Sequence, residues 1–509
     1  MSRPRLSPAA LAVLGTALVF FLFLAYATPY SPVDDLQWGM EEGLRWWLGG
    51  LLNGRYVGNF FAVLMCHFPV VKTLLIGLGM FALPLLMARL AGWGGKLALL
   101  PGFCFCCAGL LLMPSQVWKE TFCWVCGFGN YVISILFFLI WLLLILRAET
   151  TRTHLAGWAA ALFFLALASG LFLENLTLLN LGLALLLTLR ALVRRRGRRL
   201  ALACLAGAAA AVVPMFFNHI FLGMVSTGSA LNDLREFTFS LEDGLWAAAL
   251  AVLKEYFTAL LPLGLSYGMY LAGPSAVITA CALWRSPLRP LAVLGVVPLL
   301  CGWWSVAGGG PLPLWADSCL CWFLPGAALL LEQSPWEEKG FRLLLYLAAP
   351  LSLAPMAAIN TRGGRIFLFP LVMLVVIAAR TAAPLLNRRT LVLLAAAGMA
   401  GLMVLWGSRY VVVLSCTNLR NDLIAQSIES GRSPLVLPTD RYAQVVWWSR
   451  NPWDVECADW FRRFYHIPDD ITLIFLPPGT YETWPELSQE QWEGRIELAP
   501  SQDFVPSLP

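Results

Sequence analysis

Two adjacent carboxylates, Asp34 and Asp35, follow the first long apolar run of the chain, within the sequence SPVDD. If that run crosses a membrane, the pair lies where the chain leaves the bilayer. At the membrane surface a carboxylate can contact a lipid-borne substrate and is still hydrated enough to remain ionised. The alternative is that the pair only solvates a helix end. The context of Asp34 and Asp35 must decide between the two interpretations.

The composition indicates that most of the chain lies in lipid. Of 509 residues, 59% are hydrophobic and only 13% are charged, which is far from the balance of a soluble domain. Apolar runs recur at the length that crosses a bilayer, so we expect an all-α polytopic membrane protein with about thirteen transmembrane helices. The predicted spans are 9–27, 70–90, 97–113, 128–146, 155–173, 176–191, 200–222, 260–284, 290–307, 317–332, 343–358, 364–382 and 390–411.

The placement of lysines and arginines predicts the orientation. With these spans, one face receives far more of them than the other, including the arginine-rich segment 194–199. The positive-inside rule then predicts a cytoplasmic N-terminus and an extracytoplasmic C-terminus. A second span within 243–284 would invert everything after it, so we interpret 243–257 as an amphipathic surface helix. The expected location is a bacterial inner membrane, with the C-terminal domain in the periplasm.

The domain organisation follows from a change in composition near residue 411. Residues 1–411 are predicted to form the transmembrane domain, in which 28–69 is a long first outside loop with interfacial helices. Residues 412–509 are more polar and contain no further span. A helix near 418–430 and strands near 434–437 and 471–475 predict a small extracytoplasmic α/β domain.

Several classes of function have no support in the sequence. The four dispersed histidines show no metal-ligand spacing, so we predict no metal site. Walker A and dinucleotide-binding sequences are absent. The arginine-rich segment 194–199 is a short loop between spans, which favours anionic lipid headgroups as its partners over nucleic acid.

Most of the cysteines fall in apolar spans, where they are expected to be small core residues. Two pairs differ because the topology puts them outside: Cys123 with Cys126, and Cys416 with Cys457. In a bacterial periplasm either pair can form a disulfide. Free thiols remain the alternative for both.

The order of these features resembles the GT-C superfamily of membrane glycosyltransferases. The shared features are a first helix, an acidic pair, a loop ending in NGRYVGN, many further spans and a terminal outside domain. More narrowly, WKETFCWVCGFGNYV, SGLFLENLT and NTRGGRIFLFP resemble an uncharacterised bacterial GT-C-like family close to the glucosyltransferases that modify O-antigen. The likeness covers most of the chain. Members of that family often have His where this chain has Leu173.

The resemblance implies a hexosyl- or pentosyltransferase that takes a sugar from a polyprenyl-phosphate donor by direct displacement, with inversion. The acceptor would be a glycan or lipid of the cell envelope. A hydroxyl acceptor needs a carboxylate that takes its proton, which is the catalytic role expected for Asp34 or Asp35. In an extended segment, neighbouring side chains point to opposite faces. Only one of the two is then the base, and we favour Asp34.

The leaving phosphate needs cations, and Arg362 and Arg365 in NTRGGR are the best candidates. The planar fork of arginine binds phosphate oxygens in pairs. The alternative is that both anchor helix ends in the headgroup layer. The supporting candidates are Lys119 and Arg55 for the donor phosphate, and Glu120, Asn130, Glu174 and Asn59 for the substrate.

Purely structural roles are the alternative for some of these supporting residues. Lys119 and Glu120 are neighbours that can form a surface ion pair worth little. Glu174 can make a structural hydrogen bond between helices in place of a site contact. The predicted reaction requires no cofactor, although a divalent cation could bridge Asp34 or Asp35 to the phosphate.

Two other classes of function compete with sugar transfer. A lipid or glycan transporter or flippase would be expected to have ionisable residues near the middle of several spans, whereas the candidates here gather at one face. A third hypothesis treats the membrane part as a scaffold for the tail. The tail tryptophans could stack on glycan or dock on the rest of the protein; they are Trp447, Trp448, Trp453 and Trp460.

Overall fold

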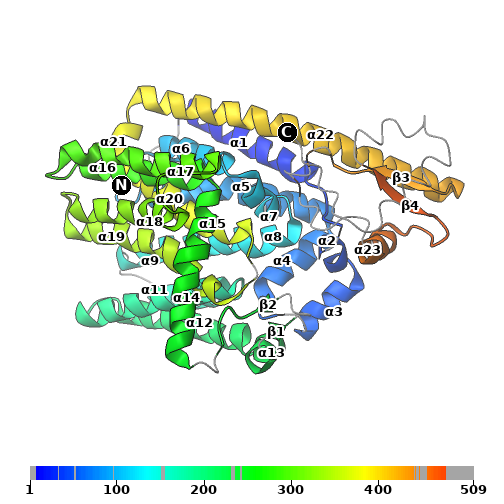
Figure 1. Ribbon diagram of the computed structural model, residues 1–509, viewed down its shortest axis with the longest axis horizontal. Helices are drawn as coiled ribbons and strands as arrows, with labels where there is room; N and C mark the ends of the chain where they lie inside the picture. Colours follow the sequence, from blue (N-terminus) through cyan, green and yellow to red (C-terminus); the bar gives the residue numbers. More distant parts are fainter. Residues whose placement is uncertain are drawn as a thin grey trace.

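The structure is a bundle of long helices, most of which lie along a common axis (Figure 1). The computed structural model describes residues 7–32, 34–50, 53–95, 97–150, 155–227, 229–230, 235–240, 244–360, 362–440, 442, 446 and 455–476. Within these residues, eleven helical segments are long and apolar enough to cross a membrane, or twelve if one bent pair counts as a span. This agrees with the predicted helical multi-pass architecture.

The helices and strands occur in an order that follows the predicted spans and loops. They are α1 (Pro8–Ala27), α2 (Asp34–Trp38), α3 (Glu41–Gly49), α4 (Tyr56–His67), α5 (Pro69–Ala91), α6 (Leu99–Leu111), α7 (Ser115–Thr121), α8 (Val125–Gly127), η1 (Phe128–Val132), α9 (Ile133–Thr150), α10 (Leu155–Ser169), α11 (Glu174–Val193), α12 (Arg198–Phe216), α13 (His219–Thr227), β1 (Ser229–Ala230), β2 (Arg235–Glu236), α14 (Leu245–Glu255), η2 (Tyr256–Leu260), α15 (Leu261–Ser266), α16 (Met269–Trp284), η3 (Arg289–Gly295), α17 (Val296–Ala307), α18 (Leu314–Leu331), α19 (Trp336–Leu353), η4 (Ala354–Ala358), η5 (Gly364–Phe367), α20 (Leu368–Thr381), α21 (Ala383–Leu386), α22 (Arg389–Ser430), β3 (Leu435–Pro438), α23 (Val455–Tyr465) and β4 (Leu473–Leu476).

The third predicted span is a bent pair of helices. Helix α6 ends at Leu111, and α7 leaves it at an angle of 98°. Pro114 directly precedes α7, and proline has no N–H with which to continue a helical hydrogen-bond pattern. The bend turns α7 across the end of the bundle and gives Glu120 its position there.

The predicted span 260–284 is wrong, because the chain breaks inside it. A continuous helical segment runs from Leu245 to Ser266, and α16 begins after Gly268. Gly268 has a φ of +62°, which a residue with a side chain rarely adopts. Figure 1 shows α14 and α15 lying crosswise to α16, α18 and α19. That direction is compatible with the surface helix predicted for 243–257, although Leu245–Ser266 is one of the eleven segments long and apolar enough to cross a membrane. Residues 241–243 lie outside the described residues.

The predicted boundary at residue 411 falls inside one long helix. Helix α22 runs unbroken from Arg389 to Ser430, which is about 63 Å at the usual rise per residue. That length is about twice the thickness of a bilayer core. The predicted helix at 418–430 is therefore the outer end of the last span, which passes beyond the bundle (Figure 1).

Beyond α22 the chain forms a small α/β unit. Strand β3 pairs with β4 in parallel, with Leu435 opposite Leu473, so the two predicted strands are confirmed. Helix α23 precedes β4 and packs against the same apolar cluster, in which Phe461 contacts Phe475. The unit described here is smaller than the predicted domain, because residues 477–509 lie outside the described part of the chain.

The tail unit docks on the first outside loop. Leu36 of α2 belongs to the apolar cluster of the tail, and the rings of Trp46 and Trp460 meet edge to face at 6.3 Å. Arg463 also forms an ion pair with Glu42. Trp460 therefore packs against the protein itself, as one of the two interpretations predicted. Trp447, Trp448 and Trp453 lie outside the described residues.

The two ends of the bundle are held by different polar contacts. At one end, Arg380 donates to the carbonyl oxygens of Ala91 and Trp93 at 3.0 and 2.8 Å, and Glu332 bridges two arginines. The other end holds α2, α3, α4, α23 and the short strands (Figure 1). Arg380 and Glu332 belong to segments predicted for the cytoplasmic face, whereas α2, α3 and α4 belong to the loop predicted outside. We name the two ends the inner end and the outer end after those predictions.

A buried ion pair at the inner end leads to a stability prediction. Glu332 and Arg342 are each 1% exposed, with an N–O distance of 2.6 Å. Glu332→Gln leaves the buried guanidinium with only the longer ion pair to Glu338, at 4.0 Å, which is expected to lower the free energy of unfolding by about 3–5 kcal/mol. Thermal unfolding in detergent measures the loss. Glu337→Gln is the control, because Glu337 is 81% exposed in its pair with Arg194; equal losses in the two variants would contradict the prediction.

Candidate functional site

The acidic pair lies at the outer end, at the start of a short helix. Asp34 and Asp35 are the first two residues of α2, so the segment is helical, and the alternation of side chains in an extended segment does not apply to it. Successive residues of a helix are about 100° apart, and the two carboxylates still differ in environment. Asp34 is half-buried, whereas Asp35 is completely buried.

Asp35 is a structural carboxylate that joins two loops. One of its oxygens accepts hydrogen bonds from the backbone N–H groups of Ser31 at 2.8 Å and Val125 at 3.2 Å, and the other accepts from Cys126 at 2.9 Å. Burial raises the pKa of Asp35, and donors from Cys126, Ser31 and Val125 oppose that shift. Asp35 therefore ties α2 to the segment before α9.

Glu120 and Arg365 form the centre of the outer polar cluster. The backbone N–H of Arg365 donates to a Glu120 oxygen at 3.1 Å, and the guanidinium lies 3.9 Å from the same atom. Gln116 also donates to Glu120. A side chain at Gly363 would collide with the Glu120 carboxylate, so glycine is what allows this close approach. The NTRGGR turn and the WKET motif, far apart in sequence, thus meet.

Arg365 lies between aromatic rings at the mouth of a narrow crevice. Its guanidinium carbon is 5.5 Å from the ring centre of Trp124 and 6.0 Å from that of Tyr131. The crevice beside it is lined mainly by apolar side chains of α9, α11 and α20, among them Leu176 and Phe369. Its volume is about 10 Å³, room for about one water molecule.

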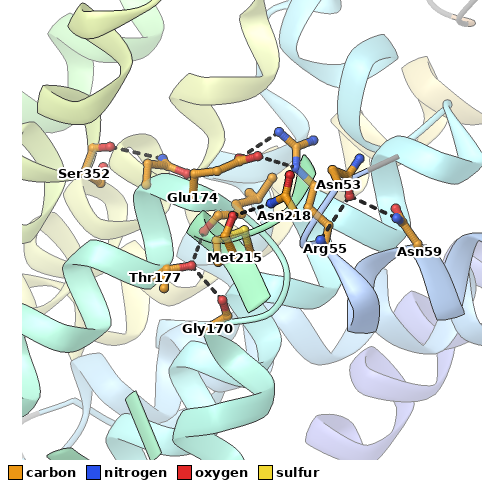
Figure 2. A network of polar contacts seen from close by, with 11 residues as sticks. Asn53, Arg55, Asn59, Gly170, Glu174, Thr177, Met215, Asn218 and Ser352 are labelled. Atoms are coloured by element: carbon orange, nitrogen blue, oxygen red, sulfur yellow. Dashed lines mark hydrogen bonds and ion pairs between the residues drawn. The ribbon is translucent and has the colours of Figure 1, made fainter. Parts of the chain in front are cut away.

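Arg55 and Glu174 bind each other. Figure 2 shows the bidentate pair, in which Nε donates to Oε1 at 3.1 Å and a terminal nitrogen donates to Oε2 at 2.8 Å. Burial lowers the pKa of the Arg55 guanidinium, but the charge of Glu174 and contact with Tyr131 raise it further, so Arg55 remains cationic. Arg55 was expected to bind the donor phosphate and Glu174 to bind the substrate. In the structure the charges of these two side chains neutralise each other. Tyr131 connects them to Arg365.

The remaining candidates, Asn59, Asn130 and Lys119, also lie at the outer end. The two asparagines make hydrogen bonds to residues close to them in sequence. Asn59 donates to the side chain of Asn53 at 3.0 Å (Figure 2). Asn130 donates to the Cys126 carbonyl at 3.0 Å. Lys119 is half-buried on α7 next to Glu120.

Arg362 diverges from Arg365. Its guanidinium forms an ion pair with Glu255 of α14, at 2.6 Å. The two arginines of NTRGGR therefore bind different carboxylates, and Arg362 ties the turn to the crosswise helix.

The predicted pair of Cys123 and Cys126 is not joined in the structure. Cys123 and Cys126 are free, and each faces elsewhere: Cys123 contacts the Tyr410 hydroxyl, and the Cys126 sulfur lies 3.9 Å from that of Cys66. Trp124, which lies between them, has an extended backbone, and the two cysteine side chains point in different directions. Cys416 is also a free thiol, and the side chain of Cys457 lies outside the described residues.

Asp35, Cys66 and Cys126 also form a compact group of potential metal ligands. Their ligand atoms all lie within 4.8 Å of one another, and all three side chains are buried. Thiolates and a carboxylate are donor types that Zn²⁺ accepts. The Asp35 oxygens, however, already accept three backbone hydrogen bonds. The group differs from the predicted bridge between an aspartate and a donor phosphate, which would need an accessible carboxylate.

Sequence reasoning missed three partners of the predicted residues: Tyr131, Gln116 and Glu255. Tyr131 directly follows Asn130 in a motif already singled out, so its place was available from the sequence. Gln116 precedes Glu120 by one helical turn, a spacing that puts both on one helix face. Nothing in the sequence relates Glu255 to Arg362.

These contacts define a class of protein: a helical, multi-pass membrane protein with paired charged side chains gathered at one end of its bundle. Neither the crevice beside Arg365 nor a second cavity, lined by residues of α11 and α12 such as Arg190 and Leu200, is lined by Asp34 or Asp35. Comparisons with protein-family models, curated proteins and solved structures found no match to this chain.

The Arg55–Glu174 pair supports a second stability prediction. The two side chains are 16% and 28% exposed, so Glu174→Gln leaves a largely buried guanidinium without its charge partner. We expect the free energy of unfolding to fall by about 1–3 kcal/mol, measured by thermal unfolding in detergent. Glu41→Gln is the matched control, because its pair with Arg45 is 85% and 75% exposed. If both variants unfold like the parent protein, the buried pair does not stabilise the outer end.

Proposed function

We propose that this protein is a GT-C-type glycosyltransferase of a bacterial inner membrane. It transfers a sugar from a polyprenyl-phosphate donor to a glycan or lipid acceptor on the periplasmic face. The resemblance of the sequence motifs to that superfamily suggests the reaction. The outer end of the bundle offers side chains suited to it.

The observation that best supports the proposal is the position of Arg365 beside an apolar crevice. Its guanidinium is 23% exposed, and the crevice next to it runs between α9, α11 and α20. A polyprenyl phosphate has the matching chemistry, with an anionic head and a hydrocarbon tail. Because the crevice, at about 10 Å³, has room for only about one water molecule, donor binding requires these helices to move apart.

Arg365 is suited to stabilise the leaving group. As the bond between the anomeric carbon and the phosphate oxygen breaks, negative charge grows on the phosphate. A fixed cation in a water-poor site lowers the energy of that transition state. The ion pair of Arg365 with Glu120 is long, at 3.9 Å, so the guanidinium keeps donors for phosphate oxygens.

Asp34 is the better candidate for the base. Asp35 is committed to backbone donors, whereas Asp34 is only half-buried on the same helix. The acceptor hydroxyl oxygen forms a bond to the anomeric carbon, its proton passes to Asp34, and the phosphate leaves with the electron pair of the broken bond. A single displacement of this kind inverts the anomeric configuration.

The two groups are linked through the segment that precedes α9. Asp35, next to Asp34, accepts from the backbone of Val125 and Cys126, and Arg365 packs over the neighbouring ring of Trp124. The segment 124–126 therefore connects the acidic helix on one side with the arginine on the other. In the proposed reaction the acceptor approaches from the α2 side and the donor from the crevice.

The test uses purified full-length protein in detergent with a panel of polyprenyl-phosphate sugars and cell-envelope glycan acceptors. The expected result is release of free polyprenyl phosphate that depends on protein and acceptor. Reconstituted vesicles provide the second arm. If labelled lipid-linked sugar crosses the bilayer with its sugar–phosphate bond intact, and no donor in the panel is cleaved, the protein is a transporter and the proposal fails.

A further inference from the structure

A cavity at the inner end of the bundle has the chemistry of a lipid headgroup site. It has a volume of about 230 Å³ and lies where α9, α10, α11 and α12 meet. Arg190, Arg194 and Arg196 line one part of it, and apolar side chains such as Leu162 and Leu200 line the other. The cavity is separate from the outer cluster of Arg365 and Glu120.

The turn between α11 and α12 presents these arginines. Helix α11 ends at Val193 and α12 begins at Arg198. Arg195 and Gly197 adopt positive φ values of 54° and 69°, which reverse the chain within a few residues. Arg190, Arg194 and Arg196 all have exposed side chains.

Among the described residues, Glu337 is an acidic group beside this cluster, and it is a weak competitor for an anionic ligand. Arg194 is 3.5 Å from a Glu337 oxygen, and the two side chains are 52% and 81% exposed. Exposed pairs of this kind contribute little and are screened by salt. A phosphate can therefore replace Glu337 at Arg194.

The surface beside the cavity continues into the region that faces lipid. Helices α11 and α12 both qualify as membrane spans. Near the turn, Leu189, Leu192 and Leu202 are about half exposed and Val193 is 84% exposed. In a membrane these side chains contact acyl chains, so a cationic rim and an apolar surface lie next to each other.

We propose that this cavity binds the phosphate of an anionic phospholipid, with its acyl chains along the apolar faces of α11 and α12. Guanidinium groups bind phosphate oxygens in pairs, and the three arginines surround one space. The apolar wall accounts for the preference for a lipid over a free anion. The site does not depend on sugar transfer.

The experiment measures retention of phosphatidylglycerol by the purified full-length protein in a neutral detergent, using native mass spectrometry. Arg190→Gln, Arg194→Gln and Arg196→Gln are combined in one variant. Because this variant loses all three guanidinium groups that line the cavity and pair with the phosphate oxygens, it is expected to bind at least about tenfold more weakly. Phosphatidylcholine at the same concentration should be retained far less than phosphatidylglycerol by the parent protein.

A matched variant separates the cavity from the charge of the turn. Arg195→Gln, Arg198→Gln and Arg199→Gln remove the same charge from the same turn, and none of these residues lines the cavity. This variant should bind within about twofold of the parent, since it keeps the three cavity arginines whose guanidinium groups pair with the phosphate oxygens. Equal weakening of both triple variants would show a diffuse surface attraction and overturn the proposal.

Two further arms test the lipid part of the claim. Cys204→Phe keeps all the arginines but fills the apolar wall, to which Cys204 belongs, so it should also weaken retention. Inorganic phosphate at the concentration of the lipid should leave retention unchanged. Displacement by inorganic phosphate, or full retention by Cys204→Phe with an unchanged unfolding temperature, would overturn a lipid site.

Discussion

Asp34→Asn is expected to abolish sugar transfer while leaving the protein folded. Loss of a general base typically slows a reaction by about 10²–10⁴-fold, because the amide cannot take the proton of the acceptor hydroxyl. The side chain is half-buried at the first position of α2, so the isosteric amide should fit. The measurement is release of polyprenyl phosphate by purified variant and parent protein, with thermal unfolding of both.

Asp35→Asn is the informative contrast, because the expected defect is structural. The new amide group must point toward at least one backbone N–H among those of Ser31, Val125 and Cys126, which now donate to Asp35. A buried donor left without an acceptor costs about 1–3 kcal/mol. The variant should unfold earlier, whereas Asp34→Asn should not.

Glu41→Gln controls for the loss of one negative charge on the same loop. Glu41 is exposed on α3, and this variant should keep full turnover. If Asp34→Asn turns over like Glu41→Gln, Asp34 is not the base. If Asp35→Asn loses turnover at an unchanged unfolding temperature, the catalytic carboxylate is Asp35 and the assignment within the pair is reversed.

The helical multi-pass architecture was predictable because lipid imposes a length on each crossing. Runs such as α1 and α5 are long, apolar and bounded by polar residues, and they match the predicted spans within a residue or two. The misjudged region, 260–284, is apolar throughout but divided at Gly268. Hydropathy reports how well a residue is accommodated in lipid and says nothing of the direction in which a helix runs.

The gathering of the candidate residues at one end was also predictable, but their pairing was not. Topology alone places the SPVDD, WKET, ENLT and NTRGGR motifs at the same face. It does not show that Arg55 and Glu174 neutralise each other across 119 residues of chain, since any nearby cation could have been the partner.

The role of Asp35 could not be deduced from its residue type. Its partners are backbone N–H groups, which every residue except proline possesses. No pattern of side chains therefore marks the segment that will donate to it. For the same reason the CWVC motif predicted a local thiol pair, whereas folding turned Cys126 toward Cys66 and Cys123 toward Tyr410.

Arg365→Gln is expected to lower turnover by about 10²–10³-fold, the usual cost of removing one group that stabilises developing negative charge. The defect should persist at saturating donor, because the charge on the phosphate grows only as the bond breaks. Arg365→Lys should recover a small part of the activity, since a lysine keeps the charge but loses the planar fork that binds two oxygens. The measurement is the steady-state rate of polyprenyl phosphate release by the parent protein, Arg365→Gln and Arg365→Lys.

A structural explanation for this loss must be excluded, because Arg365 also neutralises Glu120, whose side chain is only 3% exposed. In Arg365→Gln the Glu120 carboxylate loses that partner, and the fold should weaken. The double variant Glu120→Gln with Arg365→Gln removes the uncompensated charge, so the unfolding temperature should return toward that of the parent. Turnover should stay low, because no cation faces the leaving phosphate. Recovery of turnover in the double variant would mean that Arg365 only balances Glu120, and the proposed phosphate site would then have lost its principal cation.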